Sequence, residues 1–391
     1  MTIYLDYAAT TPLDPGVLKT MLPYMSSEYG NPSSLHGSGR RAGRAIEETR
    51  KKVAGVINAL PEEIIFTGSG TESDNLAILG VSRANKAKGN HLIISAIEHK
   101  AVLESVNQLK KEGFEVSLLP VNSEGVVDIK KCLELVRDET LLVSVMYANN
   151  EIGTIQPIRE LSEAIKKKRG RSSFPLFHTD ACQAAGYLSL DVCELGVDMM
   201  TLNGSKIYGP KGIGILYKRT GVKLEPLIVG GGQEYNLRAG TENISLVVGF
   251  GEALLLAEKM KIAESERLTA LREYFISRLF EEIPNIVLNG ARKERLPNNV
   301  HVSISHVEGE AILLMLDEQG IEVSTGSACS ANDLKASHVL LAIGQTDELA
   351  HGSIRFSFGR DTTKEKLDEA LKVLPSVVNK LETISATTVN I

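Results

Sequence analysis

Short apolar runs alternate with longer segments of helical periodicity between about residue 50 and residue 220. Glycine and proline residues separate many of these elements. The apolar runs that predict strands are Glu63–Thr67, His91–Ser95, Leu141–Tyr147, Leu176–Thr179 and Asp198–Leu202. Helices are predicted between them, for example at residues 71–86 and 158–168. This alternation predicts an α/β fold with a mostly parallel sheet and helices on both faces, in which ligands bind at the carboxyl ends of the strands.

The pattern changes after about residue 258. A long charged amphipathic helix, at about Lys259–Glu282, leads into a second unit with strands near Val300–Ile304 and Ser353–Phe356. A last helix is expected after Thr363, and Pro375 should bend or break it.

Two domains are therefore expected, which fits a chain of 391 residues. The larger domain comprises residues 14–258. The smaller one comprises residues 1–13 and 259–391, with the N-terminal segment packed on the second unit.

Composition and charge narrow the function classes. The formal net charge of −6, from 49 acidic and 43 basic residues, argues against a nucleic-acid surface. No apolar run approaches the roughly 20 residues needed to span a bilayer, and the first residues do not resemble a signal peptide, so a cytoplasmic location is expected. The four cysteines, Cys132, Cys182, Cys193 and Cys329, lack the paired short spacing of a zinc site or a disulfide framework.

The candidate chemistry centres on the turn Asn203–Gly212, which follows the strand ending at Leu202. Lys206 lies in this turn among small residues, where burial favours the neutral amine. A neutral lysine is the nucleophile that forms Schiff bases with aldehydes such as pyridoxal phosphate. A solvated β-turn is the alternative, and the turn alone does not decide between them.

Other predicted strand ends carry groups that suit such a cofactor. Gly68–Thr71 opens a helix whose backbone N–H groups suit a phosphate, although a plain helix cap explains it equally well. Asp180 is suited to pair with a protonated pyridine nitrogen, with a helix N-cap as the alternative. Asn150 either presents its amide to a ring oxygen or belongs to a turn. His99 either stacks on a flat ring or moves protons near neutral pH, with a structural role as the alternative. Each signal is weak alone, but their joint occurrence at strand ends predicts one site.

Two further residues lie in the second unit. Cys329 belongs to the small-residue segment Ser324–Asp333, which is typical of an exposed loop, so its thiol is either a nucleophile or incidental. Arg355 lies in a strand-like run and is suited to a substrate carboxylate or to a structural ion pair.

The chain resembles the cysteine desulfurases of the NifS/IscS-like group, which are class-V aminotransferase relatives and fold-type I pyridoxal phosphate enzymes. The resemblance runs nearly end to end and consists of many ordered matches. The matching segments are Tyr4–Asp6, Ala9–Pro12, Gly30–Ser34, Thr71–Asn75, Glu98–Lys100, Asn149–Gly153, Asp180, Gln183, Lys206–Gly212, Gly230–Glu234, Arg238–Thr241, Ser327–Cys329 and Ser353–Phe356. The resemblance implies a large domain with a mostly parallel seven-stranded sheet and a smaller α+β C-terminal domain.

The resemblance also implies roles for individual residues. Lys206 binds pyridoxal 5'-phosphate covalently, His99 stacks on its ring and assists proton transfer, and Asp180 pairs with its nitrogen. Cys329 attacks the sulfur of L-cysteine, which leaves a persulfide on the enzyme and releases alanine. The remaining implied contacts are Gln183 and Asn150 at the phenolic oxygen, Gly70, Thr71, Asn203 and Ser205 at the phosphate, Thr241 at the phosphate of a neighbouring subunit, and Arg355 and Asn31 at the substrate.

A homodimer follows from the implied role of Thr241. The implied partners are L-cysteine and sulfur-acceptor proteins, such as a scaffold for iron–sulfur clusters, or acceptors for tRNA thiolation, without nucleic acid or membrane. No resident metal is expected, and whether Cys329 transiently ligates a nascent cluster stays open.

One departure from the family pattern precedes the lysine. The family usually has Ser-x-His, and this chain has Asn203-Gly204-Ser205, so an amide and a hydroxyl replace a hydroxyl and an imidazole. Cofactor binding is expected to survive. A related lyase or aminotransferase, including a selenocysteine lyase, and an inactive scaffold that binds sulfur acceptors are the competing interpretations. Cys329 argues against an aminotransferase, and the set Lys206, Asp180, His99 and Cys329 argues against a scaffold.

Overall fold

The computed structural model describes residues 2–326 and 336–389. Its main feature is a seven-stranded sheet. In spatial order the strands are β2 (Ile64–Thr67), β8 (Gly214–Lys218), β7 (Met199–Asn203), β6 (Leu176–Asp180), β5 (Thr140–Ser144), β3 (His91–Ser95) and β4 (Glu115–Leu119). All neighbours pair in parallel except β8, which is antiparallel to both β2 and β7. The predicted α/β class and the mostly parallel sheet are confirmed.

The five predicted strands are all present. β3 has the predicted bounds, whereas β5 ends at Ser144 instead of Tyr147. The sequence did not predict β4 or β8. β4 lies at the edge of the sheet and is largely solvent-accessible, so its pattern is more polar than that of the buried strands.

Helices cover both faces of this sheet because successive side chains of a strand point to opposite sides. In β2, Ile64 and Phe66 pack in one hydrophobic cluster and Ile65 packs in another. α3 (Gly70–Ala84) and α4 (Lys100–Lys111) cover the face of Ile65. The other face is covered by α1 (Pro15–Ser26), α2 (Gly37–Ile57), α5 (Ile129–Leu135), α6 (Ile158–Arg169), α7 (Val192–Leu195) and the first part of α9 (Ile244–Glu282). The short helix α8 (Gln233–Asn236) lies near β2.

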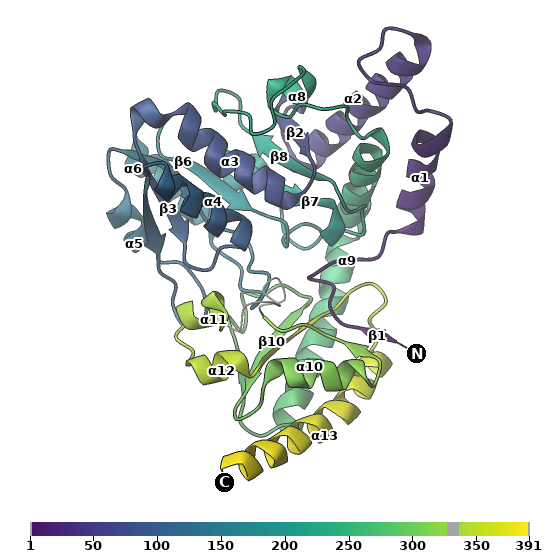
Figure 1. Ribbon diagram of the computed structural model, residues 1–391, viewed down its shortest axis with the longest axis vertical. Helices are drawn as coiled ribbons and strands as arrows, with labels where there is room; N and C mark the ends of the chain where they lie inside the picture. The colour runs from purple at the N-terminus through teal and green to yellow at the C-terminus, as the bar shows by residue number, and fades with distance from the viewer. Residues whose placement is uncertain (1, 327–335, 390–391) are drawn as a thin grey trace.

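A second layer of strands lies beyond the end of this sheet (Figure 1). Its antiparallel strands are, in spatial order, β12 (Ser353–Ser357), β10 (Asn299–Ile304) and β9 (Ile286–Leu288), and β1 (Ile3–Tyr4) pairs with β11 (Ile321–Glu322) close by. The helices here are α10 (Gly309–Asp317), α11 (His338–Ala342), α12 (Asp347–His351) and α13 (Lys364–Val389). Ile3 and Leu5 share a hydrophobic core with β10 and β12, so the N-terminal segment packs on the second unit.

The helix α9 connects the two units (Figure 1). It begins at Ile244, well before the predicted start near Lys259, and Asn243 caps it by accepting a hydrogen bond from Leu246 N. Two glycines in the first part of α9, Gly249 and Gly251, allow neighbouring helices to pack closely. A Cβ on Gly249 would lie 2.6 Å from Met21 Sδ of α1, and a Cβ on Gly251 would lie 2.4 Å from Thr49 Cγ2 of α2. Because α9 is continuous through residue 258, the domain boundary there stays a prediction.

Pro375 does not break the last helix, and the bend expected there stays a prediction. α13 runs without a break through Pro375, although a proline removes one backbone hydrogen bond. Leu371, Leu374 and Val378 on either side of Pro375 lie in the second hydrophobic core, and this packing holds the helix together. Within the described residues, none of the helices is both long and apolar enough to span a membrane.

Candidate active site

A cavity of about 520 Å³ lies at the carboxyl ends of the central strands. The large unit supplies most of its wall, and Ala8, Ala9, Gly326, Ala336, Ser337, His338 and Arg355 supply the rest. Nine residues that the sequence singled out line it: Gly70, Thr71, His99, Asn150, Asp180, Gln183, Asn203, Lys206 and Arg355. The topology therefore brings together residues spread over 286 positions of the chain (355 − 70 = 285, plus one).

The N-terminus of α3 forms one wall. Ser69 caps this helix by accepting a hydrogen bond from Glu72 N (3.0 Å), so its hydroxyl serves the cap. A Cβ on Gly70 would lie 2.8 Å from Cys182 Sγ and 3.3 Å from Asn203 Cβ, so only glycine fits against these two side chains. The first amides of a helix lack partners within the helix and favour an anion. The wall therefore fits a phosphate group.

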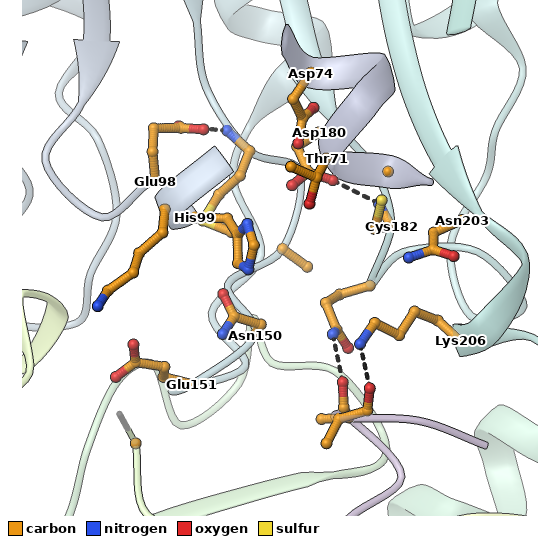
Figure 2. A pocket seen from close by; sticks show the side chains of 18 of the residues that line it. Thr71, Asp74, Glu98, His99, Asn150, Glu151, Asp180, Cys182, Asn203 and Lys206 are labelled. Carbon is orange, nitrogen blue, oxygen red and sulfur yellow. Dashed lines mark hydrogen bonds between the residues drawn. The ribbon is translucent and has the colours of Figure 1, made fainter. Parts of the chain in front are cut away.

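Lys206 extends into the cavity from a tight turn after β7 (Figure 2). Its Nζ donates a hydrogen bond to Ala9 O. The turn is held in place from the N-terminal segment, because Thr11 donates to Ser205 O through its backbone N (2.9 Å) and its Oγ1 (3.0 Å). A Cβ on Gly204 would lie 2.8 Å from Pro210 O, which explains the glycine beside the lysine.

A buried carboxylate lies opposite, at the end of β6. Asp180 Oδ1 accepts a hydrogen bond from Cys182 N (2.9 Å), and its backbone oxygen accepts one from Tyr147 N (2.8 Å). Figure 2 shows Asp180 beside Asp74. Burial, followed by the charge of Asp180, raises the pKa of Asp74 well above its usual range. A second anion is thus costly here, whereas a cationic ring nitrogen would be stabilised by Asp180.

A neutral histidine lies behind these two carboxyl groups. His178 Nδ1 is 2.9 Å from Ser144 Oγ, its Nε2 is 3.1 Å from Thr201 Oγ1, and burial lowers its pKa to about 4. Asp74 Oδ1 is 3.7 Å from His178 Nε2 and has no hydrogen-bond partner among the described residues. The negative charge of Asp180 therefore faces the cavity with little neutralisation from behind.

The side chains of His99, Asn150 and Gln183 line the cavity together with Asp180 and Lys206. His99 caps α4, and its Nδ1 accepts a hydrogen bond from Ala101 N (3.1 Å), so the neutral ring carries its proton on Nε2. Figure 2 shows this ring near the side chain of Asn150. Gln183 donates from Nε2 to Ala8 O (3.0 Å). A flat ring with polar substituents fits between these groups.

The structure shows one of the two roles that the sequence left open for Arg355, the structural ion pair, and its contact with a substrate carboxylate stays a prediction. Arg355 forms an ion pair with Asp6 (Nη2 to Oδ1, 2.8 Å) and donates from Nη1 to Asn150 O (2.9 Å). Its Nε is buried and has no hydrogen-bond partner in the described part of the chain. The guanidinium is thus fixed at the cavity wall and retains a donor.

Three predicted site residues do not line the main cavity, and a fourth is not described. Asn31 and Thr241 line a separate cavity of about 360 Å³. Ser205 Oγ donates to Asn203 Oδ1 (3.2 Å), and Ser205 is not among the described residues that line the main cavity, so its contact with a phosphate stays a prediction. Cys329 lies outside the described residues.

The sequence did not assign roles to several residues of the cavity wall. Asp74, Glu98, Glu151, Ser337 and His338 all line it. Asp74 lies one helical turn after Gly70, a spacing that places both on one face of α3. Glu98 and Glu151 directly adjoin His99 and Asn150, and this adjacency was the available signal.

The α/β sheet and this cavity together define a pyridoxal phosphate enzyme, and the residues present fit that cofactor. The N-terminus of α3 suits its phosphate, Asp180 suits its ring nitrogen and Lys206 suits its aldehyde.

Known proteins agree with this assignment. The profile of the class-V aminotransferase family matches residues 3–370. A cysteine desulfurase IscS from Dictyoglomus turgidum is 52% identical over 98% of this chain and 96% of its own length. A solved "NifS-like protein" covers 97% of this chain and all of its own (TM-score 0.90, 37% identity). A structure titled "SspA in complex with cysteine" covers 91% of this chain and 99% of its own (TM-score 0.80, 36% identity). The chain belongs to the class-V aminotransferase family, within its NifS/IscS-like cysteine desulfurases.

Proposed function

We propose that this enzyme removes sulfur from L-cysteine, releasing L-alanine and leaving a persulfide on Cys329. The observation that carries the proposal is the cavity itself. Lys206, Asp180 and the N-terminus of α3 line it together with Arg355. Residues on both sides of the Cys329 segment, Gly326 and Ala336, line it too.

The cofactor is held at three points in this proposal. Lys206 Nζ binds its aldehyde, Asp180 its ring nitrogen, and the α3 amides with Gly70, Thr71 and Asn203 its phosphate. Pyridoxal phosphate, when bound, supplies an electron sink for the negative charge that develops at the substrate Cα. Gln183 and Asn150 hold the edge of the ring, and His99 covers its face.

The remaining residues act on the substrate. Arg355 binds the cysteine carboxylate, and its unpaired Nε supports this role. His99 and Lys206 are placed to hold and move protons. The Cys329 thiolate attacks the substrate sulfur, so an S–S bond forms and the C–S bond breaks. Cysteine and the Cys329 thiol thus become alanine and the Cys329 persulfide, with the transferred sulfur oxidised and the substrate Cβ reduced.

The wider setting is also a proposal. The enzyme acts as a homodimer in which Thr241 reaches the phosphate of the neighbouring subunit, and Asn31, which lines the same separate cavity, contacts the substrate there. It works in the cytoplasm and passes sulfur to acceptor proteins for iron–sulfur cluster assembly or tRNA thiolation. The name IscS of the relative from Dictyoglomus turgidum supports the first of these pathways.

Two variants test the reaction. Lys206→Ala should abolish the yellow colour of the purified enzyme, because the cofactor loses its covalent attachment. Cys329→Ser should keep the colour but stop the release of sulfide and alanine from cysteine in the presence of a reducing agent. Absorption spectra measure the bound cofactor in both variants, and assays of sulfide and alanine measure turnover. A colourless wild type after saturation with pyridoxal phosphate, or undiminished sulfide release by Cys329→Ser, would refute the proposal.

A further inference from the structure

Glu151 is a buried carboxyl group of the cavity wall that the mechanism above does not use. Its backbone is held on both sides, because Glu151 N donates to Asn149 Oδ1 (2.8 Å) and Glu151 O accepts from Asn299 Nδ2 (2.9 Å). Figure 2 shows its side chain beyond Asn150, away from Asp180 and Lys206. The carboxyl group is thus fixed at the side of the cavity that faces the second unit.

The first contact of this carboxyl group is with Ser337. Ser337 Oγ donates a hydrogen bond to Glu151 Oε2 (2.5 Å). The same hydroxyl caps α11 by accepting from Val339 N (3.2 Å) and Leu340 N (3.4 Å). A hydroxyl has one proton, and because its oxygen accepts from the helix, that proton is directed to Glu151.

The second contact is with Gly326. A Cβ at this position would lie 2.8 Å from Glu151 Oε2 and 3.0 Å from His301 Nε2, so the backbone of Gly326 passes directly beside the carboxylate. His301 does not neutralise Glu151, because burial and the charge of Arg355 lower the histidine pKa to about 3. Gly326 is therefore packed between a carboxyl group and a neutral imidazole, in a space that only glycine fits.

The two contacts meet at one atom. Gly326 and Ser337 lie on either side of residues 327–335, the segment that contains Cys329, and both approach Glu151 Oε2. A second link supports the C-terminal side, where His338 Nε2 is 3.0 Å from Glu98 O. On the N-terminal side, Ser324 exchanges backbone hydrogen bonds with Arg355 (2.7 and 3.2 Å).

We propose that Glu151 is a positioning residue of the desulfurase reaction, which acts by fixing Gly326 and Ser337. The inference rests on the proposed function, in which Cys329 must reach the substrate sulfur. The position of a nucleophile strongly affects the rate, since misplacement by about 1 Å can cost about 100-fold. Gly326 and Ser337 are the described residues on either side of Cys329 in the chain, and Glu151 Oε2 holds both at the cavity wall.

The test compares Glu151→Ala with Glu151→Gln. Glutamine keeps the size and an acceptor oxygen for Ser337, whereas alanine removes both. We expect Glu151→Ala to lower kcat for alanine formation by 10- to 100-fold with KM for cysteine within about threefold. Cysteine should change the absorption of the bound cofactor as in the wild type, because binding precedes the attack. Glu151→Gln should restore most of the lost rate.

The variant Gly326→Ala tests the same contact by changing Gly326 instead of Glu151. Its added methyl group should displace Glu151 Oε2 and reproduce the kcat defect without removing any polar group. Gly55→Ala is the matched control, because a Cβ at Gly55 meets no atom within 4 Å. The rate of Cys329 alkylation by iodoacetamide, followed by peptide mass, gives a readout independent of turnover. We expect Glu151→Ala to change it at least threefold and Gly55→Ala to leave it unaltered.

Three outcomes would overturn the inference: a wild-type kcat for Glu151→Ala, loss of the absorption change with cysteine, or Glu151→Gln as slow as Glu151→Ala. The second would make Glu151 a binding residue, and the third would make its charge the essential property. Failure of the proposed function is distinguishable, because the wild type would then form no alanine or Cys329→Ser would remain active.

Discussion

Single residues of the cavity show how burial sets the charge of its wall. Glu98 accepts hydrogen bonds from Ser95 Oγ and Met146 N through Oε1, and its Oε2 is buried with no partner among the described residues. Burial, followed by the charge of Asp180, raises the pKa of Glu98 to about 8. Glu98 is therefore protonated at neutral pH and adds no negative charge to the cavity wall.

Replacement of Glu98 by glutamine should flatten the pH dependence of stability. The folded pKa of about 8 lies above the ordinary value of 4.5, so folding takes up a proton between these values and stability falls as pH rises. The contribution is complete below about pH 4.5, is lost as pH rises through 8, and has a slope of up to ~1.4 kcal/mol per pH unit. Urea unfolding at pH 5.5, 7 and 8.5 measures it.

The partly exposed Glu28 supplies the control for this experiment. Glu28→Gln should follow the wild-type dependence, and Glu98→Gln should lose less stability than the wild type between pH 5.5 and pH 8.5. Parallel curves for Glu98→Gln and the wild type would show that Glu98 does not take up the proton.

At the scale of elements, a buried ion pair joins α2, β2 and α8. Arg50 donates from Nη1 and Nη2 to the two carboxylate oxygens of Glu234 (2.9 and 2.8 Å), and Phe66 N donates to Glu234 Oε2 (2.8 Å). Glu234, Tyr235 and Asn236 all have positive φ angles, of 45°, 58° and 64°, which residues other than glycine rarely adopt. The ion pair holds this strained turn, which precedes Thr241.

Glu234→Ala should lower the free energy of unfolding by about 3–5 kcal/mol, because it leaves Arg50 buried without its main partner. The matched control is Glu28→Ala, which removes a surface partner of Arg41 and should cost less than about 1 kcal/mol. Urea unfolding of both variants measures the difference. Equal small losses would mean that Arg50 finds other partners when Glu234 is removed.

The elements also show where a sequence pattern is sufficient to predict the bounds of a strand or helix. β3 could be predicted to the residue because all five of its side chains are buried and its run is uniformly apolar apart from its ends. The start of α9 could not, because its first part is buried against α1 and α2, with Gly249 and Gly251 at the contacts, and lacks the charged face of the part after Lys259. Tertiary packing also explains why the helix continues past Pro375, since it outweighs one lost hydrogen bond.

At the scale of the whole molecule, the separate cavity with Asn31 and Thr241 needs an explanation. It lies apart from Lys206 within one chain, and exposed apolar side chains such as Tyr29 (79% exposed) lie beside it. A second subunit that covers this region would explain both features and would place Thr241 at a neighbouring active site.

Coexpression of Lys206→Ala with Thr241→Ala tests the shared site. If Thr241 serves the neighbouring subunit, the mixed dimer contains one site with both defects and one intact site, so it should regain about half of the wild-type cofactor binding at full affinity. If Thr241 serves its own chain, both sites stay defective. Cofactor titration of the purified mixed dimer measures this, and a monomer in sedimentation would exclude the shared site.

The sequence alone determined the α/β class and nine of the residues that line the cavity, because a strand followed by a polar turn is a local pattern. Lys206, Asp180 and His99 each follow such a strand. Only the tertiary structure decided which side chains share a cavity and which are charged there. Ser205 turned out to face Asn203, and Glu98 and Glu151 joined the cavity wall. Burial and contacts between distant segments, which set these properties, depend on how the whole chain packs and are not encoded in any short stretch of it.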